Sequence, residues 1–414
     1  MSSIIKGTKE YRQVNIAFFA AGFVTFITLY DMQPLLPVFS REFGVPAALA
    51  SLPLSLATCT LAVALLFVGA LSETLGRKEV MIASLFLTSA LALATALTHT
   101  FAGLLSIRFF QGIAMAGLPA VAMAYLSEEI APESLSAAMG LYIGGNAMGG
   151  MTGRIFTATV AQYYSWRTAL ALIGVSCLLL SLYFAKALPG SVNFRRRAFA
   201  PRALLRSILE PLTDPGLRFL YGVSFVIMGS FVTLYNYITF RLLAAPFSLS
   251  HSVVGWIFLV YLLGSLTSSE VGRLVERVGR GRGLMLLLMT MVVGALVTLS
   301  SVLGVIVVGV AIFTCGFFGA HSIASSWVGA RARTARAQAA SLYLFAYYFG
   351  SSVSGTAGGF FWSWRQWPGV VLLILALLMV GLFFYRRLAG FSEDEKIAAG
   401  AVCRVESIHG AGRA

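Results

Sequence analysis

The chain has 414 residues, of which 58% are hydrophobic and only 11% charged, and its formal net charge is +14. A water-soluble domain of this length cannot bury so much apolar side chain, so the composition excludes a soluble fold and indicates a membrane protein. The positive charge alone could indicate a nucleic-acid partner, but its distribution along the chain argues for a membrane surface.

Twelve apolar runs are each long enough to cross a bilayer as a helix, which takes about 20 residues. They lie near 13–38, 50–71, 80–98, 101–127, 136–161, 165–187, 217–243, 251–271, 283–301, 303–328, 337–361 and 366–388. Because hydrocarbon offers the backbone no hydrogen-bond partner, the sequence predicts an all-α membrane protein with twelve transmembrane helices.

A polar segment rich in Arg and Pro divides these runs into six and six. We therefore expect an N-terminal six-helix bundle over 1–188, a cytoplasmic linker over 189–216, a C-terminal six-helix bundle over 217–388 and a cytoplasmic tail over 389–414. The short polar N-terminus has none of the features of a removable signal peptide.

Basic residues gather on one side of the predicted membrane. An even number of spans puts both termini on the same side, and 24 of the 30 Lys and Arg residues fall on that side. The positive-inside rule then places both termini in the cytoplasm of a bacterial cytoplasmic (inner) membrane. Anionic lipid, and not nucleic acid, is the partner expected for these charges.

The first span carries Asp31, about sixteen residues and on the order of 24 Å from its cytoplasmic start at 1.5 Å per residue. An ionisable residue at such a depth is expensive and is by default a functional hypothesis. The next polar turn, between the second and third spans, reads G-x-L-x-E-x-x-G-R over residues 69–77.

This turn is repeated 203 residues later, over residues 272–280, between the eighth and ninth spans. The two acids would lie on the cytoplasmic face, where each could latch the positive N-terminus of a helix from the other half. The glycines allow a tight turn, and the plain alternative is a solvated loop that obeys the positive-inside rule. The predicted cytoplasmic gate comprises Gly69, Glu73, Gly76, Arg77, Gly272, Glu276, Gly279 and Arg280.

The fourth span carries Arg108, on the order of 20 Å from the cytoplasmic side across a core of ~30 Å. Because this depth agrees with that of Asp31, the two side chains could pair. The guanidinium would favour the charged carboxylate and burial the neutral one, so separating the pair would let Asp31 take up a proton. The alternative is a static buried ion pair, or an acid at the wet rim.

The fifth span carries Gly145, Gly149 and Gly153 on one helical face, a spacing typical of close helix packing. Arg154 comes directly after this series and is a competing charge that we expect near the periplasmic end of the span. Further repeats relate the halves in parallel, since Leu-Tyr-Asp at 29–31 matches Leu-Tyr-Asn at 234–236. Asn236 cannot titrate, so a proton site would belong to the N-terminal half.

Aromatic and polar residues on several spans are candidates for the substrate cavity. Rings beside one acid would suit a lipophilic cation, although aromatic residues also form ordinary packing and interfacial belts. An imidazole in the tenth span could relay protons, but a hydrogen-bonded core histidine is the more common situation. The candidates are Tyr30, Asn146, Tyr235, Asn236, Tyr237, His321, Trp327, Tyr343 and Tyr347.

These motifs resemble those of the major facilitator superfamily. The turn at 69–78 looks like its signature loop, with Glu where the acid is usually Asp. L-x-x-x-R-x-x-Q-G at 104–112 resembles the family's fourth-span motif, whose Arg is associated with proton coupling. G-N-A-M-G-G at 145–150 resembles the fifth-span antiporter motif, with Asn where Pro is expected. Within the family, the chain is most similar to the bacterial acriflavine-sensitivity (YnfM-type) group of drug and sugar exporters.

We therefore expect a secondary active transporter that exports a lipophilic or cationic small molecule by proton antiport and alternating access, as the resemblance implies. Its partners would be the substrate, protons and membrane lipids, without a cofactor or metal, and the protein would be a monomer. Asp31 would carry the proton, with Arg108 as its modulator.

Two alternatives stay open. The first is a proton symporter that imports a sugar or organic acid, because Asn146 leaves the antiporter motif imperfect. The second is a receptor or regulator that transports nothing, although neither linker nor tail is long enough for an appended soluble domain. An enzyme is not expected, since the sequence contains no convergent catalytic set, Walker loop or metal-binding motif.

Overall fold

The computed structural model describes residues 4–196, 198, 200–332 and 335–411, with side chains up to residue 390. The predicted all-α class is confirmed in this part of the chain, which contains no strand beyond an isolated bridge between Ile4 and Ile130. The predicted tail, 389–414, lies outside the part with described side chains except for its first two residues.

The helices of the first half run in chain order as α1 (Lys9–Tyr30), η1 (Gln33–Leu35), α2 (Leu36–Glu42), α3 (Ala47–Ala50), α4 (Leu52–Leu75), α5 (Arg77–Ala96), α6 (Phe101–Met115), α7 (Gly117–Glu129), α8 (Pro132–Tyr163) and α9 (Trp166–Ala187). The next helices are α10 (Pro201–Leu209), η2 (Glu210–Thr213), α11 (Pro215–Leu243), α12 (His251–Gly255), η3 (Trp256–Val260), α13 (Tyr261–Val278), α14 (Arg280–Val297), α15 (Leu303–Arg331) and α16 (Arg336–Ala411).

Ten helical stretches in the described residues are long and apolar enough to cross a membrane. The predicted fifth span lies in α8, which is not among the ten because its glycines and polar residues lower its hydropathy. The predicted eleventh and twelfth spans both lie in α16, where non-helical dihedral angles at Arg365 and Gln366 interrupt the helix. With these two cases resolved, every predicted span corresponds to a helix or to a run of consecutive helical segments.

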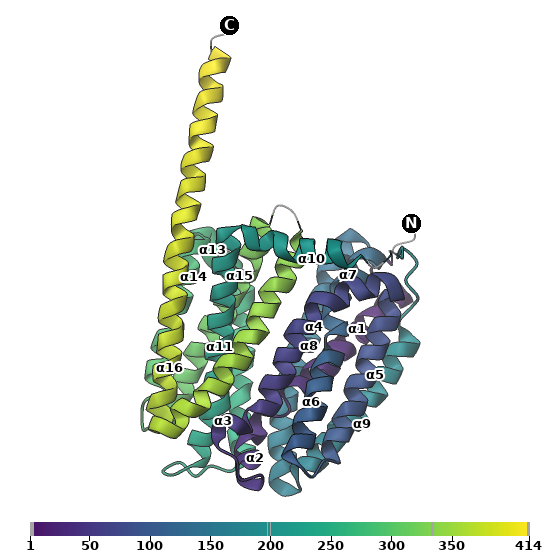
Figure 1. Ribbon diagram of the computed structural model, residues 1–414, viewed down its shortest axis with the longest axis vertical. Coiled ribbons are helices and arrows are strands. Elements are labelled where there is room, and N and C mark those ends of the chain that lie inside the picture. The colour runs from purple at the N-terminus through teal and green to yellow at the C-terminus, as the bar shows by residue number, and fades with distance from the viewer. Residues whose placement is uncertain (1–3, 197, 199, 333–334, 412–414) are drawn as a thin grey trace.

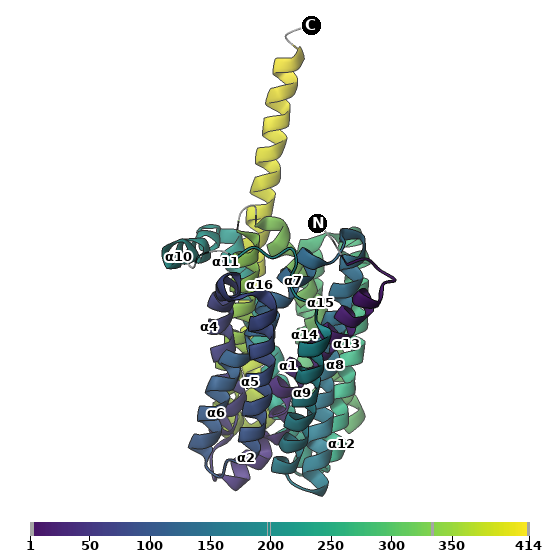
Figure 2. The same cartoon turned by 90° about the vertical axis from the view of Figure 1, so that its right-hand side faces the viewer.

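The helices form two groups that stand side by side. Figure 1 shows α1, α5, α6 and α9 on the right and α11, α14, α15 and α16 on the left. Contacts between the groups run through α4 against α16 and through α8 against α12, and Figure 2 shows α12 beside the lower part of α8. Figure 1 also shows α10 lying across the upper end of the molecule.

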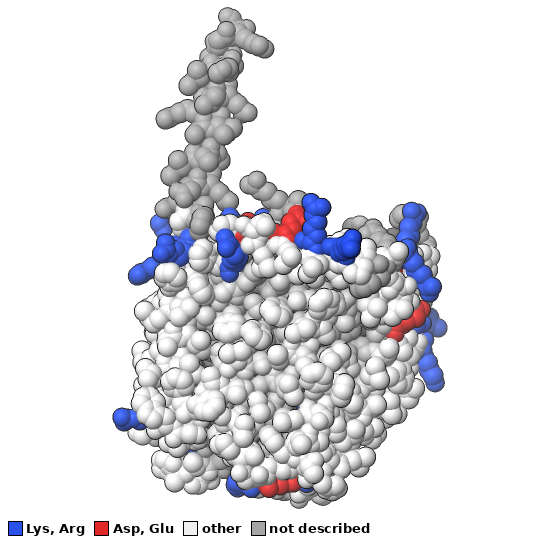
Figure 3. All heavy atoms as spheres, in the orientation of Figure 1, with Lys and Arg blue, Asp and Glu red and all other residues white. Residues whose placement is uncertain are grey.

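The two ends of the bundle differ in charge. We call the upper end in Figure 1, where α1 begins and where α4 and α13 end, the terminal face, and the lower end, with α2 and α3, the distal face. Figure 3 shows Lys and Arg side chains gathered around the terminal face and few on the broad apolar flank below it. This distribution is that expected of a multi-pass membrane protein.

Hydrogen bonds join the two groups toward the distal face. Arg41 Nη2 lies 3.0 Å from His251 Nε2, and the His251 backbone N–H donates to Gln162 Oε1 over 3.0 Å. Ser352 Oγ donates to the backbone oxygen of Ser55 over 2.6 Å. These contacts hold α2, α4 and α8 of the first group against α12 and α16 of the second.

The glycine seam predicted on α8 lies directly against α1. A Cβ atom built at Gly145, Gly149 or Gly153 would lie 2.3, 2.4 or 2.7 Å from a backbone oxygen of α1. The second half repeats this arrangement, since a Cβ atom at Gly350 of α16 would lie 2.2 Å from the backbone oxygen of Phe225 in α11. Each pair of helices can approach so closely only because the side chain is missing.

We predict that Gly149→Ala lowers the thermal unfolding midpoint of the detergent-purified protein, because the new methyl group would collide with the α1 backbone. Gly144→Ala is a matched control on the same helix, since nothing lies within 4 Å of its added Cβ. The control should be neutral or stabilising by up to about 1 kcal/mol, the helix-propensity gain of Gly→Ala. Equal midpoints for the two variants, measured by scanning fluorimetry, would contradict the close seam.

Candidate functional site

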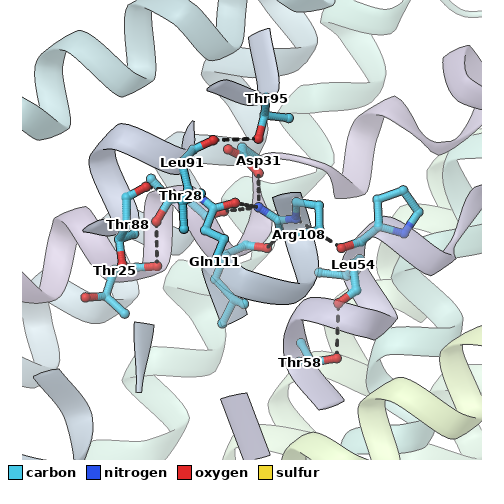
Figure 4. A network of polar contacts seen from close by, with 12 residues as sticks. Thr25, Thr28, Asp31, Leu54, Thr58, Thr88, Leu91, Thr95, Arg108 and Gln111 are labelled. Carbon is cyan, nitrogen blue, oxygen red and sulfur yellow. Dashed lines mark hydrogen bonds and ion pairs between the residues drawn. The ribbon is translucent and has the colours of Figure 1, made fainter. Parts of the chain in front are cut away.

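Asp31 and Arg108 lie together inside the first group of helices, as Figure 4 shows. Asp31 comes after the last residue of α1, where its backbone N–H donates to the oxygen of Ile27 over 3.1 Å. The Asp31 Oδ1 atom lies 3.7 Å from Nη1 of Arg108, which projects from α6, and the two side chains are 1% and 0% exposed. The depth argument from the sequence thus brought the correct two residues together.

Most of the donors of Arg108 bind groups other than Asp31. Its Nε donates to the backbone oxygen of Pro53, and its two Nη atoms donate to those of Thr28 and Leu29, over 2.9–3.1 Å. Nη1 also donates to Oε1 of Gln111 over 2.7 Å. Asp31 Oδ1, by contrast, has no hydrogen-bond partner in the described part of the chain. The guanidinium is therefore held by backbone, while the carboxylate receives little beyond a longer-range attraction.

Arg154 is a second buried guanidinium, and the sequence analysis underrated it. We expected it near the periplasmic end of its span, but its side chain is 2% exposed between the two groups of helices. Its Nε donates to Gln33 Oε1 over 2.5 Å and its Nη1 to the backbone oxygen of Gly150 over 2.6 Å. A basic residue inside an apolar run, without an acid at a neighbouring position, was the signal that could have found it.

Aromatic rings from both groups surround Arg154. Its Cζ atom lies 4.0 Å from the ring centroid of Tyr30 in the first group. It lies 4.7 and 5.3 Å from the centroids of Tyr261 and Phe258 in the second. Tyr235, a candidate from the sequence, stacks on Phe258 and contacts Tyr261 at centroid distances of 5.4 and 5.0 Å. Two of the predicted cavity residues, Tyr30 and Tyr235, thus belong to one cluster of rings around a cation.

A polar bridge connects this cluster to the second group. Gln33, which bonds Arg154, donates from Nε2 to Oδ1 of Asn236 over 2.8 Å. Asn236 Nδ2 is buried and has no hydrogen-bond partner among the described residues. Asn236 was predicted as a cavity candidate because the repeat aligns it with Asp31. Gln33 has no such match, since the corresponding residue of the second half is Ile238.

Three other candidates meet within the second group. His321 Nδ1 lies 2.9 Å from the hydroxyl of Tyr343, and the His321 ring lies 4.8 Å from that of Tyr347. The ring of Phe317 stacks on His321 at 6.1 Å. The imidazole is therefore already hydrogen-bonded and enclosed by rings.

The remaining cavity candidates point elsewhere. Tyr237 donates to the backbone oxygen of Gly355 and packs between α11 and α16. Asn146 faces α1, where its Oδ1 would lie 2.3 Å from a Cβ atom at Gly22. Trp327 is buried near Gly281 at the start of α14, toward the terminal face.

The two repeated turns have nearly the same backbone. Gly76 ends α4 with φ +117° and ψ 143°, and Gly279 ends α13 with φ +80° and ψ 160°. Each N–H donates to the residue four positions earlier, and an L-residue would be strained at either φ. The first glycines are less constrained, since a Cβ atom at Gly69 would meet its nearest atom at 3.9 Å and one at Gly272 would meet nothing within 4 Å.

The charged residues of the first turn bind within their own group. Arg77 donates to both carboxylate oxygens of Glu128 over 2.9 and 3.3 Å and to Ser72 Oγ over 2.6 Å. Glu73 lies 3.7 Å from Arg77 Nη2, with 38% of its side chain exposed. In the second copy, Gly272, Glu276 and Arg280 are all exposed. The neighbouring Glu270 pairs with Arg273 over 2.5 Å.

No group of three or more His, Cys, Asp or Glu side chains in the described residues is arranged to hold a metal ion. The chemistry that remains is that of one acid and two guanidiniums at the centre of the bundle.

Comparison with known sequences identifies relatives along nearly the whole chain. Residues 15–242 match the sequence model of the Major Facilitator Superfamily. The chain is 48% identical to the uncharacterized MFS-type transporter YybF of Bacillus subtilis, over 94% of this chain and 96% of that protein. It is 44% identical to the inner membrane transport protein YnfM of Escherichia coli, over 93% of each.

Solved structures share the fold at low sequence identity. A bacterial homologue of the human lysosomal transporter Spinster, in an inward-facing and occupied conformation, superimposes with a TM-score of 0.71 at 15% identity, over 92% of this chain and 98% of that one. The nucleoside transporter NupG gives a TM-score of 0.73 at 12% identity, over 92% and 99% of the two chains.

We predict that Arg108→Gln destabilises the protein by about 3–5 kcal/mol, because it leaves a buried carboxylate and several backbone oxygens without their donor. Asp31→Asn should be milder, since Arg108 keeps its other four hydrogen bonds.

Thermal unfolding in detergent tests this, and the double variant Asp31→Asn, Arg108→Gln is the control. It should recover part of the loss, because no uncompensated charge remains. A double variant less stable than Arg108→Gln alone would refute the charge argument.

Proposed function

The chain belongs to the Major Facilitator Superfamily of transporters, and we propose that it is a proton-coupled secondary transporter. In this proposal it exports a small amphipathic molecule across the bacterial cytoplasmic membrane by alternating access. The one observation that carries the coupling is the buried Asp31 carboxylate, whose Oδ1 has no hydrogen-bond donor in the described part of the chain.

An ionised carboxylate with an oxygen that has no donor in a dry interior is costly, and protonation removes that cost. Arg108 opposes protonation by its charge, at 3.7 Å and without a hydrogen bond. A small displacement of Arg108 is therefore enough to change which form of Asp31 is favoured. The pair can release a proton on one side of the membrane and bind one on the other if the opening of each side changes this distance.

The cargo site that the geometry supports is the ring cluster between the two groups of helices. Tyr30 comes from the first group, and Phe258, Tyr261 and Tyr235 from the second. Rings suit the apolar part of a small molecule. The sequence led us to expect a lipophilic or cationic substrate. We now propose a lipophilic substrate and not a cation, because Arg154 at the centre of the cluster would repel a positive charge.

The charge distribution supports an orientation with the terminal face in the cytoplasm. The basic side chains around that face would contact anionic lipid headgroups, each worth about 1 kcal/mol near the membrane surface. Both chain ends would then be cytoplasmic, and a monomer contains both groups of helices that alternating access needs.

The repeated turns would act as gates on the cytoplasmic side. Glu73 is partly exposed, and within the described residues its side chain is held only by a 3.7 Å contact to Arg77, so it is free to turn toward a helix N-terminus of the other group. Glu276 would do the same from the second group. Closure of this side would then be stabilised by two carboxylates at helix N-termini.

A second candidate function is uptake of an organic acid together with protons. Arg154 favours it, because its positive charge would attract an organic anion. A proton bound at Asp31 would lower the electrostatic cost of binding that anion, and the bound anion would lower the cost of binding the proton.

We predict that Asp31→Asn abolishes pH-gradient-driven transport in everted vesicles, since an amide cannot carry the proton. Exchange of labelled for unlabelled substrate without a gradient should persist, which shows that the variant still folds and binds. Glu270→Gln, an exposed acid outside the pair, is the control and should transport normally. Full gradient-driven transport by Asp31→Asn would eliminate Asp31 as the proton site.

Proteoliposomes that contain the purified protein decide between export and uptake. Substrate added to proteoliposomes should drive protons in the opposite direction to the substrate if the protein is an antiporter. Protons that move with the substrate would establish the second candidate in its place.

We further predict that the double variant Glu73→Gln, Glu276→Gln slows transport several-fold without changing equilibrium substrate affinity, because closure toward the cytoplasm loses two favourable charge interactions. Glu270→Gln again serves as the matched control. A transport rate equal to that of the unmodified protein would remove both acids from the gate.

A further inference from the structure

We propose that Arg154 is the binding site for the anionic group of the substrate, and that the substrate is an organic anion with an apolar or aromatic body. This inference rests on the proposed transport function and specifies its cargo. It is carried by the charge, the free donors and the surroundings of this one side chain.

The charge of Arg154 is not neutralised. In the part of the chain with described side chains, the ion pairs involve Arg77, Arg108, Arg167, Arg273 and Arg331, and none includes Arg154. Yet Arg154 is as buried as Arg108, which has its own acid. A buried cation without an acid is expensive, so the site would gain from an anion supplied from outside.

Several N–H donors of the Arg154 guanidinium are also unused within the described residues. The guanidinium has five N–H groups, of which one on Nε and one on Nη1 donate to Gln33 and Gly150. The hydrogens of Nη2 and the second hydrogen of Nη1 form no hydrogen bond within the described residues. This pair of nitrogens is the edge that binds a carboxylate with two parallel hydrogen bonds.

The surroundings supply a further unused donor and the apolar walls. Tyr261, whose ring lies 4.7 Å from Arg154 Cζ, has a buried hydroxyl that finds no hydrogen-bond partner among the described residues. Tyr30 and Phe258 complete the walls around the guanidinium. A carboxylate at Arg154 could accept from the Tyr261 hydroxyl, while its apolar body lies against the rings.

The site is built from both groups of helices. Arg154, Tyr30 and Gln33 belong to the first group, and Tyr261 and Phe258 to the second. Gln33 further bonds Asn236 of the second group. An anion bound here would therefore contact both groups, as a transported substrate must when access alternates.

The alternative is that the rings alone stabilise Arg154 through cation–π contacts, each worth about 0.5–2 kcal/mol. Arg154 would then be a structural link between the groups and would bind no anion. The two possibilities differ in whether an added anion binds in preference to a neutral molecule of the same shape.

The test is equilibrium binding to detergent-purified protein at neutral pH, without any proton gradient, using naphthoate, the neutral naphthamide and the cationic naphthylmethylammonium. Calorimetry should show that naphthoate binds at least tenfold more tightly than naphthamide and that the cation does not bind. Arg154→Gln should remove this preference, and Arg154→Lys should keep part of it. An equal affinity for naphthoate and naphthamide, or no binding of naphthoate, overturns the proposal.

Two variants guard against misfolding. Gln33→Glu places a carboxylate 2.5 Å from Arg154 Nε, so it should raise the unfolding midpoint and abolish naphthoate binding at the same time. Tyr261→Phe keeps the ring but removes the unpartnered hydroxyl, and should weaken binding several-fold. Undiminished binding by Gln33→Glu would show that naphthoate binds elsewhere.

The preference for naphthoate over naphthamide can be measured separately from proton coupling. Asp31→Asn should keep the preference for naphthoate, because the ion pair that Asp31 forms is with Arg108 and not with Arg154. Loss of coupling in that variant with unchanged binding by Arg154→Gln would overturn the anion site and leave the proposed function intact. Normal coupling by Asp31→Asn together with loss of naphthoate binding by Arg154→Gln would support the anion site and overturn the proposed role of Asp31.

Discussion

The cost of charge in an apolar interior is the constraint on which the centre of this protein depends. Two guanidiniums and one carboxylate lie almost completely away from solvent, and each is treated differently. Arg108 is satisfied by backbone oxygens and Gln111. Asp31 Oδ1 has no donor in the described part of the chain and lies 3.7 Å from Arg108, whereas Arg154 is held by rings, the Gln33 amide and the backbone oxygen of Gly150. In the proposed function, Asp31 is protonated when Arg108 is displaced, and the charge of Arg154 is neutralised by a bound anion.

The two halves share architecture but not chemistry. The glycine seams of α8 on α1 and of α16 on α11 repeat, as do the left-handed glycines at 76 and 279. Where Asp31 ends α1, Asn236 occupies the matching place in α11 and accepts a hydrogen bond from Gln33. The halves are therefore two similar bundles, and the buried pair of Asp31 and Arg108 lies in the first of them.

Periodicity and depth along the sequence were enough to predict the spans, the seams and the buried pair. Apolar run lengths located the spans, the glycine spacing located the helix seams, and equal depths located Asp31 beside Arg108. The sequence could not predict which rings face Arg154, because Phe258 belongs to the 3₁₀ segment η3 and Tyr261 comes directly after it. A 3₁₀ turn has 3.0 residues instead of 3.6, so it shifts the phase of every side chain after it. Asn146 and Trp327 lie on the expected helices but away from this ring cluster, since a position along a helix does not determine which neighbour the side chain faces.

The close seam between α1 and α8 also determines which parts of the site travel together. Helices whose backbones touch without intervening side chains cannot slide without losing that contact, so α1 and α8 form a single rigid unit. Asp31 and Arg154 belong to this unit, whereas Tyr261 and Phe258 belong to the other half. If the halves part at this level, as the proposed transport requires, Arg154 keeps the Tyr30 ring of its own unit and exchanges the rings of Tyr261 and Phe258 for water. The free energy of that separation would then depend on whether an anion is bound to the guanidinium. Arg154 would in this way couple the occupancy of the site to the movement of the halves.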